Sequence, residues 1–103
     1  MQRKEFTIQN KVGLHARAAA VLVQAANKFK SNIFIEKDGK KVSAKSILGV
    51  LSLGAEKGAI ISVEIEGSNK EEAMKTIEEL IANKFGDEEW KLLLELESQK
   101  GLQ

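Results

Sequence analysis

The sequence has no cysteine, no proline and only one histidine among its 103 residues. Without cysteine there can be no disulfide, no thiol nucleophile and no thiolate metal site. A single histidine leaves only carboxylates as further metal ligands, which argues against a structural zinc site. We therefore expect neither a metal ion nor a cofactor.

One-sided charge, long apolar runs and nucleotide-binding glycine patterns are also missing. The formal net charge is +1 and aromatic residues make up 5%, whereas a nucleic-acid binder normally shows a basic stripe with stacking aromatics. No apolar run is long enough to cross a membrane, and the N-terminal residues MQRKEFTI lack the apolar core of a signal peptide. The sequence predicts one small cytoplasmic domain with a single core, no membrane insertion and no direct contact with nucleic acid.

The single histidine lies where a glycine-containing loop gives way to an alanine-rich helix. Apolar residues recur at helical spacing from Ala16 to about Lys28, so His15 is predicted at the N-terminus of that helix. Free backbone N–H groups and the helix dipole favour an anion there by roughly 0.3 to 1 kcal/mol. Arg17 is a cation in the same turn and opposes that dipole, which indicates that a negative charge visits the site.

A lone histidine is more often a structural residue or a helix cap than a reactive group. Three features favour a reactive His15: the anion-binding helix end, the nearby guanidinium of Arg17, and the small residues that follow and leave the ring accessible. A neutral imidazole can accept a phosphoryl group on a ring nitrogen, and the free N–H groups and Arg17 would hold the product. The pattern suits a reversible phosphoryl carrier.

Alternating apolar and polar residues predict four strands, each with one buried face. Asp38 and Gly39 are typical of a type I′ hairpin turn, because both residues tolerate positive φ. The predicted strands lie around Phe6 and Ile8, at 33–37, at 40–43, and around Ile61, Val63 and Ile65.

Two further helices are predicted after the hairpin. The segment 45–54 could be a buried strand, but a candidate N-cap, Ser46, and a candidate C-terminal glycine, Gly54, favour a brief helix. Ser68 and Glu71 form a capping box that opens a longer helix, with Ala73, Ile77, Leu80 and Ile81 on its inner face and Gly86 at its end.

The order of elements predicts an α+β open-faced sandwich, with helices covering one face of an antiparallel sheet. We expect the domain to span residues 1–87. Residues 88–103 form an extension, predicted as one more helix that is capped by Asp87, packs Trp90 and Leu93, and frays from Ser98. A loose tail and a partner-binding segment are the alternatives.

The segment Gly13-Leu14-His15-Ala16-Arg17, followed later by 45–54 (KSILGVLSLG), resembles HPr, the histidine-containing phosphocarrier family of the phosphoenolpyruvate-dependent sugar phosphotransferase system. The resemblance covers residues 1 to 87. It implies a four-stranded antiparallel sheet with three helices on one face. It also implies that His15 takes phosphate on Nδ1 from phospho-Enzyme I and passes it to Enzyme IIA, while Arg17 steadies the phosphoryl group. Such a protein is a phosphotransfer substrate and not an enzyme.

Ser46 has two interpretations. A serine before a helix is usually a plain N-cap, worth about 1 kcal/mol. The segment 45–54 resembles the HPr type of Gram-positive bacteria, in which the matching serine is phosphorylated by HPr kinase/phosphorylase. That resemblance implies that phosphoserine slows transfer at His15 and promotes binding to catabolite control protein A.

An apolar patch beside the histidine is implied by the same resemblance, and it would dock onto partners. A short helix cannot bury all of its aliphatic residues on one side, so we expect Ile47 and Leu48 to be exposed. The alternative is that these residues belong to the core. The patch consists of Ala16, Ala20, Ile47, Leu48 and Leu51.

Ala18 departs from the family pattern, which usually has proline at this position and so a stiffer loop. We expect a monomer. Two rival functions remain open: a purely regulatory HPr-like module that acts through Ser46, and a small ligand-binding sandwich, which the fold alone does not exclude.

Overall fold

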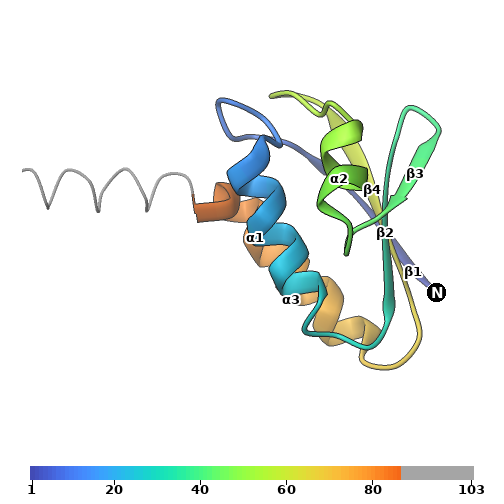
Figure 1. Ribbon diagram of the computed structural model, residues 1–103. Coiled ribbons are helices and arrows are strands. Elements are labelled where there is room, and N and C mark those ends of the chain that lie inside the picture. Colours follow the sequence, from blue (N-terminus) through green and yellow to red (C-terminus); the bar gives the residue numbers. More distant parts are fainter. Residues whose placement is uncertain (87–103) are drawn as a thin grey trace, which may run out of the picture.

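The structure, a computed structural model, describes residues 1–86 as a four-stranded antiparallel sheet with three α-helices on one face (Figure 1). This confirms the predicted fold class and the order of its elements. The predicted C-terminal helix and the extension 88–103 lie outside the described residues. The elements are β1 (Gln2–Thr7), α1 (Ala16–Ala26), β2 (Asn32–Lys37), β3 (Lys40–Ser43), α2 (Ile47–Ser52), β4 (Ile60–Glu66), α3 (Lys70–Ala82) and the short 3₁₀ helix η1 (Lys84–Gly86).

The strands pair in the order β1-β4-β2-β3, and every neighbouring pair is antiparallel. Strands β2 and β3 are joined by Asp38 and Gly39, whose φ angles are 51° and 83°. Both residues have a left-handed backbone conformation, as the predicted type I′ turn requires. Strand β4, the last in sequence, lies between β1 and β2 and therefore joins β1 to the β2–β3 hairpin.

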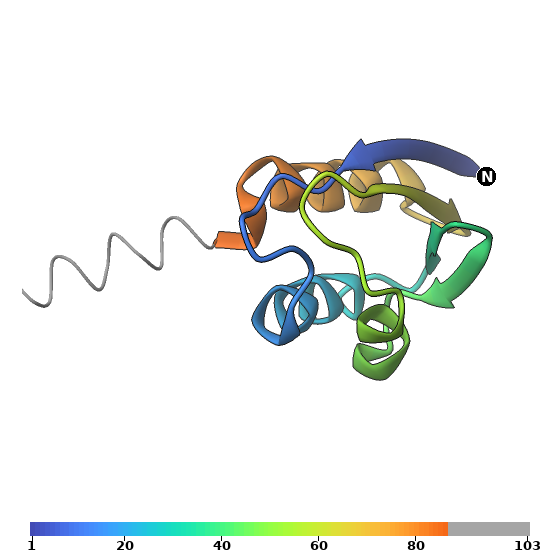
Figure 2. The same cartoon turned by 90° about the horizontal axis from the view of Figure 1, so that it is seen from above.

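The core lies between one face of the sheet and the helices. Figure 2 shows the arrangement of strands and helices from above. Helix α1 contacts both α2 and α3, while α3 packs on β1 and β4, and α2 on β3. Most of the apolar positions that predicted the helices and strands are buried, whereas Phe6 and Leu80 are half-buried and pack against the core. The core includes Ile33, Ile35, Ile61, Val63 and Ile65 from the sheet, and Leu22, Val23, Val50, Ala73, Ile77 and Ile81 from the helices.

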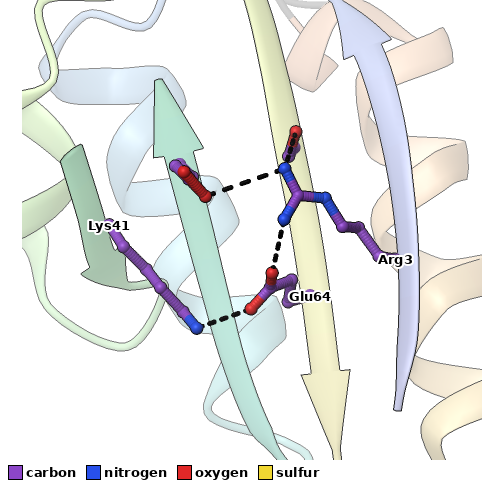
Figure 3. Close-up of polar contacts among 5 residues, drawn as sticks. Arg3, Lys41 and Glu64 are labelled. Carbon is purple, nitrogen blue, oxygen red and sulfur yellow. Dashed lines mark hydrogen bonds and ion pairs between the residues drawn. The ribbon is translucent and has the colours of Figure 1, made fainter. Parts of the chain in front are cut away.

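The opposite face of the sheet carries a charge cluster around Glu64 (Figure 3). The Glu64 carboxylate accepts from Arg3 Nη1 at 2.7 Å and lies 2.6 Å from Lys41 Nζ. Arg3 also donates to Ser62 Oγ and lies 3.7 Å from Glu36. The long side chains cover the face, so the Glu64 side chain is only 9% exposed.

This cluster changes the titration of its members. The hydrogen bond from Lys41, together with the positive charges of Lys41 and Arg3, holds the pKa of Glu64 below its usual value, although desolvation opposes the shift. The same hydrogen bond, with the nearby carboxylates, raises the pKa of Lys41. The ammonium group also lies 4.8 Å from the centre of the Phe34 ring.

The capping box predicted for α3 is wrong. The N-cap is Asn69, not Ser68, and its side chain makes no capping hydrogen bond. The reason is the turn after β4, where Gly67 and Asn69 have φ angles of 110° and 59°. A Cβ on Gly67 would lie 3.3 Å from Ser31 Cα, so this turn packs closely against the chain before β2 and delays the helix by one residue.

Two predicted helix ends also shift. Helix α1 ends at Ala26 rather than near Lys28, and α3 ends at Ala82 rather than near Gly86. Phe85 follows in the left-handed region with φ of 55° and is buried in the core. Its burial explains the early end of α3, since the chain must turn back to place this ring.

Two features are absent from residues 1–86. In this part of the chain, no helix combines the length and the apolar character needed to cross a membrane. Nor do three or more His, Cys, Asp or Glu side chains of these residues gather where they could hold a metal ion.

Candidate functional site

The loop before α1 is fixed to the loop between α2 and β4. Ile8 N donates to Ala59 O at 2.9 Å, and Gly58 N donates to Ile8 O at 2.8 Å. Further along, Leu14 N donates to Ala55 O at 2.8 Å, and the Leu14 side chain is buried. The loop segment 8–14, which leads directly into His15, is therefore attached at both of its ends.

Gly13 lets the two loops approach closely. Its φ is 68°, and a Cβ at this position would lie 2.5 Å from Ala55 O and 2.8 Å from Glu56 Cα. A larger residue would be strained in conformation and would push the loops apart. The glycine of the sequence motif is thus explained by the contact with Ala55.

Asn10 is a buried polar residue at this site that no motif in the sequence indicates. It is 1% exposed, its Nδ2 donates to Gly13 O, and its own carbonyl accepts from Gly13 N at 3.0 Å. The signal was present in the sequence, because asparagine in a loop favours hydrogen bonds to nearby backbone groups.

His15 is the N-cap of α1, as predicted. Its backbone is extended (φ −79°, ψ −178°), and its carbonyl accepts the first helical hydrogen bond from Ala19 N at 2.8 Å. Its Nδ1 accepts from the backbone N–H of Arg17 at 3.3 Å. In the neutral ring this hydrogen bond assigns the lone pair to Nδ1 and the proton to Nε2.

This arrangement directs a nucleophilic nitrogen toward the N-terminus of the helix. The ring is half-buried, whereas Ala16 and Arg17 are exposed, so a reacting group can approach from solvent. An anion bonded to Nδ1 would lie beside the first N–H groups of α1, where the helix dipole stabilises negative charge. The site can therefore hold a phosphoryl group on Nδ1.

Ser46 caps α2, and the alternative of a buried strand at 45–54 is wrong. Its Oγ accepts from Gly49 N at 3.0 Å, and Gly54 follows the helix with φ of 59°. A Cβ on Gly49 would lie 3.2 Å from Ser46 Oγ. The missing side chain at Gly49 therefore leaves room around the exposed hydroxyl.

Helices α1 and α2 lie side by side and run in opposite directions (Figure 1). Lys45 Nζ donates to Phe29 O at 2.7 Å and so connects the start of α2 to the chain that follows α1. His15 begins α1 and Ser46 begins α2, so the two candidate phosphorylation sites cap antiparallel helices.

The predicted apolar patch is partly exposed. Leu48 is 80% and Ile47 43% exposed, as expected, and Ala16 is exposed as well. Ala20 and Leu51 are half-buried, and Leu51 packs against the core. Helices α1 and α2, which carry the two halves of the predicted patch, are in contact.

Comparisons with known proteins agree with this arrangement. A family model described as the PTS HPr component phosphorylation site matches residues 2–83, which include His15, Arg17 and Ser46. The phosphocarrier protein HPr of Xylella fastidiosa is 46% identical over 88 residues, covering 85% of this chain and 99% of that protein. The crystal structure of HPr from Thermoanaerobacter tengcongensis has a TM-score of 0.81 and 50% identity, covering 84% of this chain and 98% of that one.

A relative named for catabolite repression is also similar to this chain. Crh, the Bacillus subtilis catabolite repression protein, is 39% identical with a TM-score of 0.65, over 82% of this chain and 97% of that one. Its crystal structure is a dimer with a swapped domain.

Proposed function

The chain belongs to the HPr family of phosphocarrier proteins, and we propose that its His15 accepts a phosphoryl group from phospho-Enzyme I and passes it to Enzyme IIA during sugar uptake. The observation that carries this proposal is the position of His15 Nδ1 at the N-terminus of α1, where it accepts from Arg17 N. Being a carrier, the protein is a substrate of its partners and not a catalyst.

The transfer step follows from the geometry of the ring. The lone pair on Nδ1 attacks phosphorus, a bond forms between nitrogen and phosphorus, and the bond to the donor breaks with its electron pair remaining on the donor. The proton stays on Nε2. The backbone N–H of Arg17, which donates to Nδ1 before the reaction, then donates to a phosphoryl oxygen, and the Arg17 guanidinium adds a charged hydrogen bond.

Regulation at Ser46 is part of the same proposal. HPr kinase/phosphorylase adds phosphate to the exposed hydroxyl, as in the Gram-positive HPr type. The phosphate lies next to Ile47 in sequence, so its negative charge acts on the apolar patch where Enzyme I and Enzyme IIA dock. The same phosphate gives catabolite control protein A a charged group to bind.

The apolar patch is the proposed docking surface for these partners. Exposed aliphatic residues beside a reactive group are typical of an interaction surface. A domain of residues 1–87, a monomeric state and a cytoplasmic location complete the proposal. The swapped dimer of Crh is the alternative assembly that sedimentation would detect.

Phosphorylation followed by intact mass measurement tests the proposal. The protein is incubated with phosphoenolpyruvate and Enzyme I, or with ATP and HPr kinase. The first reaction is expected to add one acid-labile phosphate that is absent in His15→Ala. The second is expected to add one acid-stable phosphate that is absent in Ser46→Ala.

The similarity to Crh favours a second candidate, a regulatory module that acts only through Ser46. Phosphorylation by the kinase alone, with no transfer from proven Enzyme I, would support this module and contradict the carrier. The presence of His15 beside Arg17 supports the carrier, since a purely regulatory module needs neither residue.

A further inference from the structure

We propose that Asn10 is a positioning residue for phosphoryl transfer, because it fixes the Gly13–Leu14 peptide group, which lies just before His15. The inference rests on the proposed function of His15 as the phosphoacceptor. Asn10 lies outside the sequence motif around His15, and being 1% exposed it is not available to a partner protein. Any effect it has on transfer must therefore act through the loop.

The peptide group between Gly13 and Leu14 is held at both of its polar atoms. Its oxygen, Gly13 O, accepts from Asn10 Nδ2, while its nitrogen, Leu14 N, donates to Ala55 O at 2.8 Å. A peptide group that is bonded on both sides cannot rotate about its neighbouring single bonds without breaking a buried hydrogen bond. Asn10 therefore fixes the plane of this peptide.

The backbone of Asn10 reinforces the same turn. Its carbonyl accepts from Gly13 N at 3.0 Å, so main chain and side chain together close the segment 10–13. Gly13 is pressed against Ala55 and Glu56, and the Leu14 side chain is buried. The direction in which the chain leaves Leu14 is thereby set, and with it the extended backbone of His15.

The position of the His15 ring depends on that direction, because the N-cap geometry of His15 places Nδ1 3.3 Å from Arg17 N. If the Gly13–Leu14 peptide rotates, Nδ1 moves relative to the first N–H groups of α1. Misplacement of a reacting group by about 1 Å can cost up to about a hundredfold in rate. Loss of the Asn10 side chain should therefore lower the rate of the transfer step without changing partner affinity.

Steady-state kinetics of phosphorylation by Enzyme I test this with two variants. Asn10→Ala removes the donor, and Asn10→Asp keeps the volume but places a carboxylate oxygen opposite Gly13 O. Both are expected to lower kcat about tenfold, with the KM for the carrier unchanged within about twofold. Amide hydrogen exchange at Leu14 is expected to accelerate, while amides in β4 stay protected.

Two control variants separate positioning from lost stability. Gln9→Ala changes an exposed neighbour, and Ile33→Val removes one buried methyl group from β2, away from the loop. Both should keep the wild-type kcat at a temperature where circular dichroism shows every variant folded. An equal fall in kcat for Ile33→Val would overturn the proposal.

The other outcomes are also decisive. Wild-type kcat in folded Asn10 variants would overturn this inference and leave the proposed function intact. If wild-type protein accepts no phosphate from proven Enzyme I, the proposed function fails and this inference fails with it. If Asn10→Ala does not fold, Asn10→Asp decides; unfolding of both would make Asn10 a structural residue and overturn the proposal.

Discussion

At the scale of single residues, the site depends on a main-chain hydrogen bond to the His15 ring and on the anchoring of the chain before it. Nδ1 accepts from Arg17 N, and the chain that enters His15 is anchored through Leu14 and Ala55. The guanidinium of Arg17 is exposed and belongs to the same turn. In the proposed function, the backbone and the side chain of Arg17 contribute to binding the phosphoryl group in different ways.

Replacing Arg17 with alanine separates these two contributions. The backbone N–H that bonds Nδ1 remains, whereas the charged side chain is lost. A hydrogen bond to a charged group is worth about 1.5 to 3 kcal/mol, so we expect transfer from phospho-Enzyme I to slow by about tenfold or more. Rapid-quench kinetics measure the rate. Arg17→Lys keeps the positive charge but lacks the planar guanidinium group, so it should recover only part of the lost transfer rate. An unfolded Arg17→Ala by circular dichroism would contradict this account.

Glu64 makes the stability of the domain depend on pH. Its pKa in the folded protein lies below the usual 4.5, so its contribution is fully present above that value and is lost as the pH falls through the lowered pKa. We expect the free energy of unfolding to fall in acid for the wild type. Glu64→Gln should be less stable than the wild type at neutral pH, and its free energy of unfolding should fall less in acid. Urea unfolding at neutral and acidic pH measures both.

Lys41 gives the opposite dependence at high pH. Its pKa is raised above 10.5, so its contribution is present below that value and is lost as the pH rises through the raised pKa.

Glu36→Gln is the matched control for Glu64→Gln, because Glu36 lies farther from Arg3, at 3.7 Å. Equal acid sensitivity in wild type and Glu64→Gln would show that the cluster does not carry the effect.

At the scale of elements, α2 depends strongly on its cap because it has only six residues. Removing the Ser46 hydroxyl leaves Gly49 N without its partner, so Ser46→Ala should lower the free energy of unfolding by about 1 kcal/mol. Ser46→Asp keeps an acceptor and should be close to wild type. Urea denaturation gives both values.

Ser68→Ala is the control for that prediction. The sequence predicts Ser68 as a cap, but the structure uses Asn69, so we expect this exposed substitution to stay within about 0.5 kcal/mol of the wild type. A loss similar to that of Ser46→Ala would mean that α3 begins at Ser68 after all.

The elements also show what the sequence could predict. Local signals identified the Asp38-Gly39 turn, the cap at Ser46 and the position of His15, because each depends on residues close in sequence. The start of α3 differs from the local capping pattern because the close packing of Gly67 on Ser31 shapes the turn before the helix.

Long-range contacts were beyond the reach of such signals. The cluster of Arg3, Lys41 and Glu64 requires the strand order and register, since Arg3 and Glu64 lie 61 residues apart. The contact of Leu14 with Ala55, which anchors the site, is also long-range and could not be predicted from local signals. The hydrogen bond of Asn10 to Gly13 is local, and asparagine in a loop is the residue type that favours it.

At the scale of the whole molecule, the two faces of the sheet have different tasks. One face packs the helices that carry His15, Ser46 and the apolar patch, and the other is covered by charged side chains (Figures 2 and 3). The adjacent helices α1 and α2 carry the two candidate sites at their N-termini, which lie at opposite ends of the antiparallel pair. Partner binding is therefore expected on the helical side alone.

A pair of exposed aliphatic residues tests that expectation. Leu48 lies in the apolar patch and is 80% exposed, while Ile60 lies in β4 and is 60% exposed. We expect Leu48→Glu to raise the KM for the carrier in the Enzyme I reaction about tenfold, because a charge is buried at the interface, and Ile60→Glu to leave it unchanged. A raised KM for Ile60→Glu together with an unchanged KM for Leu48→Glu would place the docking surface elsewhere.

The position of phosphate on the histidine ring tests the central claim most directly. Protein labelled with ¹⁵N in histidine is phosphorylated by Enzyme I, and two-dimensional NMR of the ring then identifies the nitrogen bonded to phosphorus. Because Nδ1 accepts from Arg17 N at the start of α1, the account predicts phosphate on Nδ1 of His15. Phosphate on Nε2, or a ring left unmodified by active Enzyme I, would contradict it.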